Sequence, residues 1–213
     1  MRNIILIIFI IILFSFKSYE NAIDNELKKF MVGQLQILEL AKDKKNISNL
    51  VFKNSLGEDK SFSEFKGNIL LVNFWATWCA PCIKEMPSLD RLQSKFNKNF
   101  KVLPISIDRD GIEKVKNFYI KRKIKNLDQF FDFKNTLAQE LELFGLPTSF
   151  FVNKDGIIIA KYEGDIDWDN DTVIKFIKYL NNNLLIIHTK HKYINNIIQK
   201  GFGLVDYGTT EED

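Results

Sequence analysis

The stretch NFWATWCAPCIKEMPSLDRLQ, residues 73–93, contains both cysteines of a chain of 213 residues. Cys79 and Cys82 follow the apolar run Ile69–Trp75 directly, and a helix-like pattern begins right after them. A nearly continuous apolar run is typical of a strand that is buried on both faces. We therefore predict that the two thiols lie where a buried strand turns into a helix of residues 81–97.

The position of Cys79 favours redox chemistry. Unpaired backbone N–H groups and the positive end of the helix dipole stabilise a thiolate, which is the form that attacks disulfides. Such settings can lower a thiol pKa from about 8.5 into a range of roughly 3.5–7.5. We expect Cys79 to have the lower thiol pKa and Cys82 to attack the mixed disulfide formed on it. Pro81 suits the first helical turn, where its missing N–H is not needed.

Other uses of a cysteine pair fit this sequence less well. A tetrahedral zinc site needs four ligands, but there is no second pair, and His188 and His191 lie over a hundred residues away. We therefore expect no metal. A structural disulfide across so short a loop removes little entropy from the unfolded chain. A buried, inert thiol pair stays open, although Pro81 and the flanking tryptophans favour an exposed turn.

The composition is that of an ordinary globular domain. Hydrophobic residues make up 46% of the chain and charged residues 27%. The net charge of +3 comes from basic and acidic residues mixed along the whole sequence. Without a dense basic patch, a nucleic acid is not expected as a partner.

The N-terminal residues carry a targeting pattern. Arg2 precedes the apolar run Ile4–Phe14, as in the basic and apolar regions of an export signal. A dedicated transmembrane helix needs about 20 apolar residues, so this run is short for one. The sequence leaves open a cleaved signal or a retained membrane anchor. Either way, we expect the domain to face the periplasm or another extracytoplasmic space, where disulfides persist.

The remaining pattern predicts an α/β domain with a mixed sheet and helices on both faces. The strongest hairpin signal is the turn at residues 153–156, between expected strands 148–153 and 157–162. We divide the chain into four parts: a signal or anchor (1–18), a connector (19–47), the main domain (48–182) and a tail (183–213). The other expected elements are a helix and a strand within 23–40, a strand at 50–52, a short turn of helix at 61–67, a strand at 100–107, a helix at 112–122, a strand at 130–132, and helices at 136–144 and 169–180.

Four separated stretches of the sequence form a further pattern: Phe74–Cys82 continued by Lys84–Leu89, Ile105–Arg109, Gly145–Thr148 and Gly164–Asp169. The first stretch resembles the active site of the thioredoxin superfamily, and all four, in this order, resemble its exported TlpA/ResA-like branch. The resemblance spans about residues 48–182.

This resemblance implies a thioredoxin fold with an N-terminal strand or hairpin extension. It also implies an enzyme, a protein-disulfide reductase that works by thiol-disulfide exchange and needs no cofactor. Cys79 and Cys82 would form the redox-active disulfide, with Cys79 as the attacking residue. A cis peptide bond between Leu146 and Pro147 would lie beside them and let the backbone of Leu146 pair with an extended substrate.

Further site candidates follow from the same comparison. Trp78 and Pro81 are expected beside Leu146 in contacting the substrate. Cytoplasmic thioredoxins carry a buried acid where this chain has Asn73, which cannot accept a proton. Glu85 matches the acidic residue that the ResA-like branch places one turn after its second cysteine, although a solvated helix glutamate would look the same. If Glu85 is functional, we expect burial to raise its pKa.

The family also implies partners. Its members reduce cysteine pairs in apocytochrome c or in copper-site precursors of cytochrome oxidase, and a membrane thiol-disulfide transporter supplies the electrons. A peroxiredoxin-like peroxidase would share the fold, but Thr77 is two residues before Cys79, not three, and the proline of that motif is missing. A copper chaperone would need Cys-x-x-x-Cys and a nearby histidine, and neither occurs here. A binding module with a structural disulfide is a third alternative.

Overall fold

The computed structural model describes residues 25–109 and 111–182, together with residues 14 and 18. Apart from those two single positions, the expected signal or anchor and the expected tail lie outside the described residues. Within the described part, no helix has both the length and the apolar character to cross a membrane.

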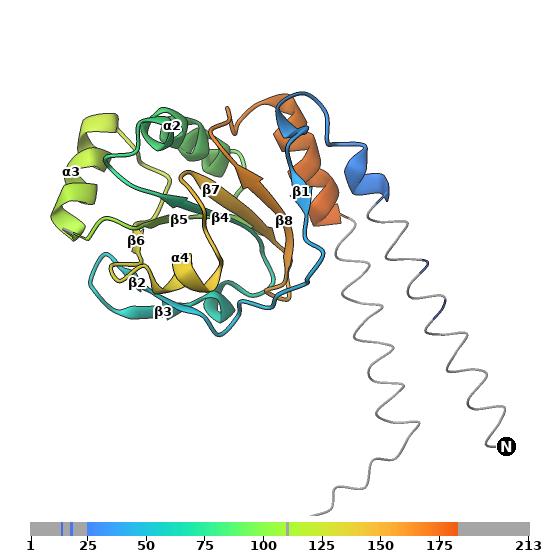
Figure 1. The fold of residues 1–213 in the computed structure, drawn as a ribbon. Coiled ribbons are helices and arrows are strands. Elements are labelled where there is room, and N and C mark those ends of the chain that lie inside the picture. The colour runs from blue at the N-terminus through green and yellow to red at the C-terminus, as the bar shows by residue number, and fades with distance from the viewer. Residues whose placement is uncertain (1–13, 15–17, 19–24, 110, 183–213) are drawn as a thin grey trace, which may run out of the picture.

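A mixed sheet of eight strands forms the centre of the described residues (Figure 1). The strand order is β1-β8-β7-β4-β5-β6-β2-β3. Strands β4, β5 and β6 run parallel, while β7, β8, β1 and the β2–β3 hairpin add antiparallel pairs. This topology confirms the predicted mixed sheet. The strands are β1 (Glu39–Leu40), β2 (Val51–Asn54), β3 (Asp59–Ser61), β4 (Ile69–Trp75), β5 (Phe100–Ser106), β6 (Phe130–Phe131), β7 (Thr148–Val152) and β8 (Ile158–Glu163).

Helices cover both faces of the sheet, as predicted. In Figure 1, α2, α3 and the C-terminal helix at residues 171–182 lie on one face, and α4 lies on the other. Ser61 caps η2 in a reciprocal capping box with Glu64, which fixes the start of this short turn of helix. The helices are η1 (Gly33–Leu35), η2 (Phe62–Phe65), α2 (Ala80–Ser94), α3 (Ile112–Arg122) and α4 (Thr136–Glu140).

Strand β4 lies in the middle of the sheet and is buried along its whole length, as its apolar sequence predicts. Its side chains alternate between two hydrophobic clusters. Leu71 and Trp75 pack with the residues of α2, α3 and the C-terminal helix, whereas Leu70 and Phe74 pack on the opposite side of the sheet. By the same alternation, Asn73 faces α2 from the centre of the sheet. A polar side chain is therefore placed in the core, directly under the helix that carries the cysteines.

The predicted hairpin turn is present between β7 and β8. The side chain of Asn153 accepts hydrogen bonds from the backbone N–H groups of Asp155 and Ile157. Gly156 has a φ of +82°, and a Cβ there would come within 2.1 Å of Ser48 Oγ. Only glycine fits this position, since it tolerates the left-handed backbone and leaves room for the side chain of Ser48.

One stretch differs from the sequence prediction. The helix expected at 136–144 ends at Glu140, because Glu142 adopts a left-handed backbone with φ of 51°. The strand expected within residues 23–40 of the connector is present as β1, which pairs with β8, and both Leu35 and Leu38 are buried. In addition, the hydroxyl of Tyr162 donates to the backbone oxygen of Gln34 at 2.9 Å, which ties this segment to the sheet.

Candidate active site

Cys79 and Cys82 form a disulfide at the start of α2. Cys79 is the N-cap residue, with an extended backbone, and its Sγ accepts a hydrogen bond from the N–H of Cys82 at 3.3 Å. Cys79 is 6% exposed, and Cys82 is completely buried. Cys79 is therefore the cysteine that another molecule can reach first. Pro81 lies in the first turn of α2, as expected, and Trp78 next to the disulfide is 63% exposed.

The loop between β4 and the disulfide is held by a buried carboxylate. Asp108 is 1% exposed and lies just beyond the end of β5. It accepts hydrogen bonds from the backbone N–H and the hydroxyl of Thr77, at 2.8 and 2.7 Å. The hydroxyl of Ser106 also donates to it at 2.8 Å. This carboxylate fixes the backbone two residues before Cys79. The sequence analysis had not singled out Asp108, although a Ser-x-Asp sequence at the end of a central parallel strand was a usable signal.

The peptide bond between Leu146 and Pro147 is cis, as the resemblance implied. The antiparallel register of β4 and β7 pairs Phe74 with Thr148, so the cis bond lies level with the residues that lead to Cys79. The carbonyl of Pro147 accepts from the N–H of Gly164 at 3.0 Å. Within the described residues, by contrast, neither the N–H nor the C=O of Leu146 has a hydrogen-bond partner. Both backbone groups of Leu146 are free to pair with an incoming chain.

A surface hollow of about 600 Å³ adjoins the cis bond. Leu146 and Ile107 form one end of this hollow. This end lies near the disulfide loop, because the N–H of Ile107 donates at 3.0 Å to the carbonyl of Trp75, the residue from which that loop starts. Phe144 forms another wall and is 87% exposed. The hollow gives an apolar side chain a place to bind beside the free peptide unit of Leu146.

Glu85 is buried on the inner face of α2, only 2% exposed. Its Oε1 accepts from the side-chain amide of Asn73 at 2.8 Å, and its Oε2 accepts from the indole N–H of Trp168 at 2.8 Å. Burial raises the pKa of Glu85 from 4.5 to about 7, while these two donors and the N–H of Ile166 oppose the rise. The predicted direction of the shift is therefore confirmed. Glu85 is not a solvated helix residue.

Asn73 connects Glu85 to the centre of the sheet. Its side-chain amide nitrogen donates both to Glu85 and to the hydroxyl of Ser149 on β7, at 2.9 Å. All three side chains are buried. The sequence analysis recognised that Asn73 cannot ionise but missed its bond to Glu85, and it missed Ser149 and Trp168 as neighbours of the carboxylate. Ser149 lies 76 positions after Asn73, and Trp168 lies 83 positions after Glu85, so no local pattern could indicate these contacts.

The described residues contain no group of three or more His, Cys, Asp or Glu side chains that could hold a metal ion. The groups that the site brings together are two sulfurs, one titratable carboxyl and the unpaired backbone N–H and C=O of Leu146.

Comparison with known proteins agrees with this arrangement. The model of the AhpC/TSA family matches residues 41–161. The chain belongs to the AhpC/TSA family. Among curated relatives, the thiol-disulfide oxidoreductase ResA of Bacillus thuringiensis subsp. konkukian is 33% identical over 122 residues, which cover 57% of this chain and 69% of the relative. This AhpC/TSA protein is thus a homologue of the ResA thiol-disulfide oxidoreductases and an enzyme of that class.

Solved structures give the same fold. A thiol-disulfide oxidoreductase from Bacteroides fragilis superposes with a TM-score of 0.54 at 31% identity, covering 64% of this chain and 99% of that one. A secreted thiol-disulfide isomerase from Corynebacterium glutamicum superposes with a TM-score of 0.56 at 18% identity, covering 67% and 92%. The second likeness concerns the fold alone. Together they confirm the thioredoxin-like fold expected from the sequence.

Proposed function

We propose that this AhpC/TSA protein is an extracytoplasmic reductase of protein disulfides in which Cys79 attacks, Cys82 resolves and Glu85 exchanges the proton. The single observation that carries the proposal is the asymmetry of the cysteine pair. Cys79 lies at the start of α2 and is 6% exposed, whereas Cys82 in the first turn of the helix is completely buried. A partner can therefore form a mixed disulfide only with Cys79. Cys82 is then placed to attack and break that mixed disulfide.

The reaction begins with both cysteines reduced. The Cys79 thiolate attacks one sulfur of the substrate disulfide, so that a mixed disulfide forms and the first substrate sulfur leaves as a thiolate. The Cys82 thiolate then attacks Sγ of Cys79, which breaks the mixed disulfide and releases the second substrate sulfur. Two electrons pass from the enzyme to the substrate. The Cys79–Cys82 disulfide seen here is the oxidised product of that cycle.

Glu85 is the proposed proton acceptor for Cys82. It lies one helical turn after Cys82, and its pKa of about 7 lets it both accept and release a proton near neutral pH. Asn73 cannot ionise, so in this proposal it orients the carboxylate rather than accepting the proton itself. The raised pKa and the bond to Asn73 support this division of roles.

The substrate would bind across the cis bond. In this proposal the free N–H and C=O of Leu146 pair with an extended substrate segment, next to Pro147, while Trp78 and Pro81 flank the reacting sulfur. The hollow beside Leu146 would take an apolar side chain near the substrate cysteine. These contacts select a flexible segment that carries a cysteine pair, rather than a small-molecule disulfide.

The natural substrates are proposed from the family resemblance. We expect cysteine pairs of apocytochrome c or of copper-site precursors of cytochrome oxidase, with a membrane thiol-disulfide transporter as the electron donor. The basic and apolar N-terminal sequence supports a location in the periplasm or an equivalent space, with residues 1–18 as signal or anchor. On this proposal, residues 48–182 form the catalytic domain, preceded by the connector and followed by the tail.

The experiment is a trap of the mixed disulfide. Cys82→Ser removes the resolving thiol, so the Cys79 thiolate should stay linked to its substrates, which can then be identified by mass spectrometry after reduction. Cys79→Ser is the matched control and should trap none of them. The parent protein should also reduce insulin disulfides in the presence of a dithiol donor. Equal trapping by the two variants, or alkylation of Cys82 before Cys79 in the reduced protein, would overturn the assigned roles.

A further inference from the structure

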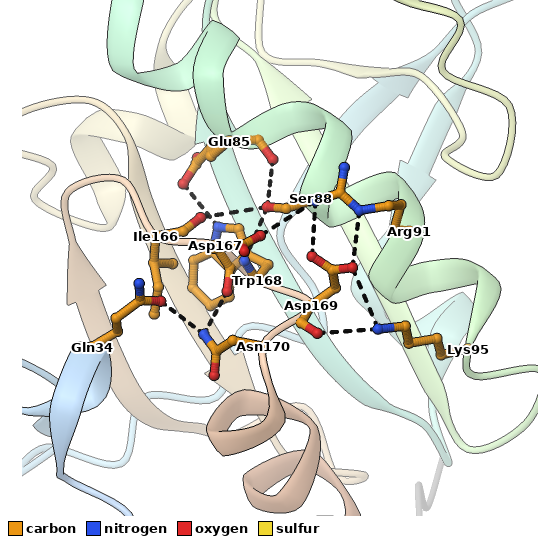
Figure 2. A network of polar contacts seen from close by, with 10 residues as sticks. All are labelled: Gln34, Glu85, Ser88, Arg91, Lys95, Ile166, Asp167, Trp168, Asp169 and Asn170. Carbon is orange, nitrogen blue, oxygen red and sulfur yellow. Dashed lines mark hydrogen bonds and ion pairs between the residues drawn. The ribbon is translucent and has the colours of Figure 1, made fainter.

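Trp168 is a buried tryptophan whose polar atom contacts the proposed proton acceptor. It lies in the loop between β8 and the C-terminal helix and is completely buried. Its indole N–H donates to Oε2 of Glu85 at 2.8 Å, across 83 positions of sequence (Figure 2). The carboxylate is thus held from two sides, by Asn73 from the sheet and by Trp168 from the loop.

The indole is fixed in place by contacts to the same helix. The backbone N–H of Trp168 donates to the hydroxyl of Ser88 at 2.9 Å, and that hydroxyl donates to the backbone oxygen of Glu85 at 2.7 Å. The ring packs against Tyr162 and Phe151, with ring centroids 5.5 and 6.2 Å away. Because both its backbone and its ring are anchored, the indole N–H keeps one direction relative to the carboxylate (Figure 2).

We propose that Trp168 is a positioning residue for the reductase reaction: its indole N–H holds the Glu85 carboxylate one turn from Cys82 and favours the ionised form that accepts the proton. This inference rests on the role proposed for Glu85. Trp168 need not touch the substrate or the sulfurs, because it acts only through the carboxylate.

The groups around Glu85 determine how strongly its ionised form depends on the Trp168 donor. The charged or titratable groups that face Glu85 are Asp165 after β8 and Tyr162 on β8, and Cys82 precedes it on α2. Asp165 and burial both raise the pKa of Glu85. Asn73 and Ser149 contribute no positive charge from the sheet. Hydrogen-bond donors lower the pKa of Glu85, and the indole N–H of Trp168 lowers it most.

The test is Trp168→Phe in the full chain, with the reductase rate followed against pH. Without the indole N–H the pKa of Glu85 should rise further, so the midpoint of the pH profile should move upward by roughly one pH unit. Tyr162→Phe is the matched control. It also removes one donor from the same aromatic cluster, but that donor serves Gln34 rather than Glu85, so the midpoint should stay in place.

A second set of variants separates this inference from the proposed function. In a Glu85→Gln background, Trp168→Phe should no longer change the pH profile, because its target is absent. A Glu85→Gln profile equal to that of the parent would overturn the role of Glu85 itself. If Glu85→Gln alters the profile but Trp168→Phe does not, only the inference on Trp168 is wrong. Should Trp168→Phe fail to fold, Trp168→benzothienylalanine keeps the ring size, lacks only the N–H and must give the same upward shift.

Discussion

Helix α2 is joined to the loop after β8 on two faces, and the two junctions are built differently (Figure 2). On the inner face, the carboxylate of Glu85 is buried and is bound by neutral donors, the amide of Asn73 and the indole of Trp168. On the outer face, Asp169 is bound by cations: Arg91 donates through Nε and Nη2, each at 2.9 Å, and Lys95 lies at 3.3 Å.

The difference lies in what each set of partners does to a carboxyl group. Neutral donors in a buried place do not fully offset the lost hydration, so the pKa of Glu85 rises to about 7. The Arg91 guanidinium and Lys95 instead hold the pKa of Asp169 well below its ordinary range. The inner carboxyl can therefore change its charge near neutral pH, whereas the outer one stays ionised. The loop after β8 thus contacts α2 through Trp168, which donates to the carboxyl that can change its charge, and through Asp169, which stays ionised.

The largest expected effect comes from turning the inner donor into an acid. Asn73→Asp places a carboxyl where the amide now donates to Glu85 at 2.8 Å and to Ser149 at 2.9 Å. Two buried carboxylates cannot both stay ionised there. We expect the free energy of unfolding to fall by about 4 kcal/mol at pH 8, as for an uncompensated buried charge. At pH 5 a proton shared by the two groups should restore much of the loss.

An exposed site offers the matched control for that substitution. The side-chain amide of Asn54 donates to Oε2 of Glu58 at 2.8 Å, but this pair lies at the surface. Asn54→Asp should cost less than about 1 kcal/mol, because water solvates both carboxylates. The measurement is urea unfolding of the oxidised protein at both pH values. Equal losses for the two variants would show that burial does not distinguish the inner junction.

The second prediction concerns stability against pH. The ordinary pKa of a glutamate is 4.5, and that of Glu85 in the fold is about 7, so between these values the folded state binds more protons than the unfolded one. The contribution of Glu85 to stability is then greatest below pH 4.5, falls as the pH rises to about 7 and is constant above it. The fall should amount to about 3 kcal/mol. Glu85→Gln should remove it, because the amide does not titrate.

The oxidised protein is the right sample for this measurement, since disulfide-bonded cysteines do not titrate. Glu64→Gln serves as the control. The capping bond from Ser61 lowers the pKa of Glu64, so this residue contributes with the opposite sign, and its removal must leave the fall between pH 4.5 and 7 in place. A parent protein with the same stability at pH 5 and pH 8 would contradict the raised pKa of Glu85.

The sequence predicted what depends on local patterns. The buried strand β4, the start of α2 at the cysteine pair and the turn before Gly156 follow from apolar runs, helix-start chemistry and turn residues. The cis bond before Pro147 and the choice of Glu85 as a site candidate came from the family resemblance, because nothing in a lone Leu-Pro pair indicates a cis bond.

The sequence could not show how distant segments meet around the site. In the sequence, Trp168 is one residue of the stretch Gly164–Asp169 that resembles the family. Its hydrogen bond to Glu85 depends on the packing of the loop after β8 against α2. The end of α4 was missed for a related reason. The apolar spacing of Leu137, Leu141 and Phe144 favours a longer helix, but Leu141 packs into the core whereas Phe144 is exposed beside a hollow, so the chain leaves the helix between them.

The smallest effect is expected on the outer face. Arg91→Gln breaks the two-point contact with Asp169, but Arg91 is 55% exposed there, so water replaces much of what is lost. We expect the free energy of unfolding to fall by less than about 1 kcal/mol at low salt. The fall should be smaller still at 1 M salt, where the Debye length is only about 3 Å.

The same contact also predicts a pH dependence. Since the pKa of Asp169 is lowered, the contribution of this ion pair to stability is present above the ordinary pKa of 3.8 and is lost as the pH falls below it. The cost should therefore be equal at pH 6 and pH 9, and the fall assigned to Glu85 should persist in the variant. A salt-independent loss above about 2 kcal/mol, or a changed pH dependence between 4.5 and 7, would mean that the two faces act as one network.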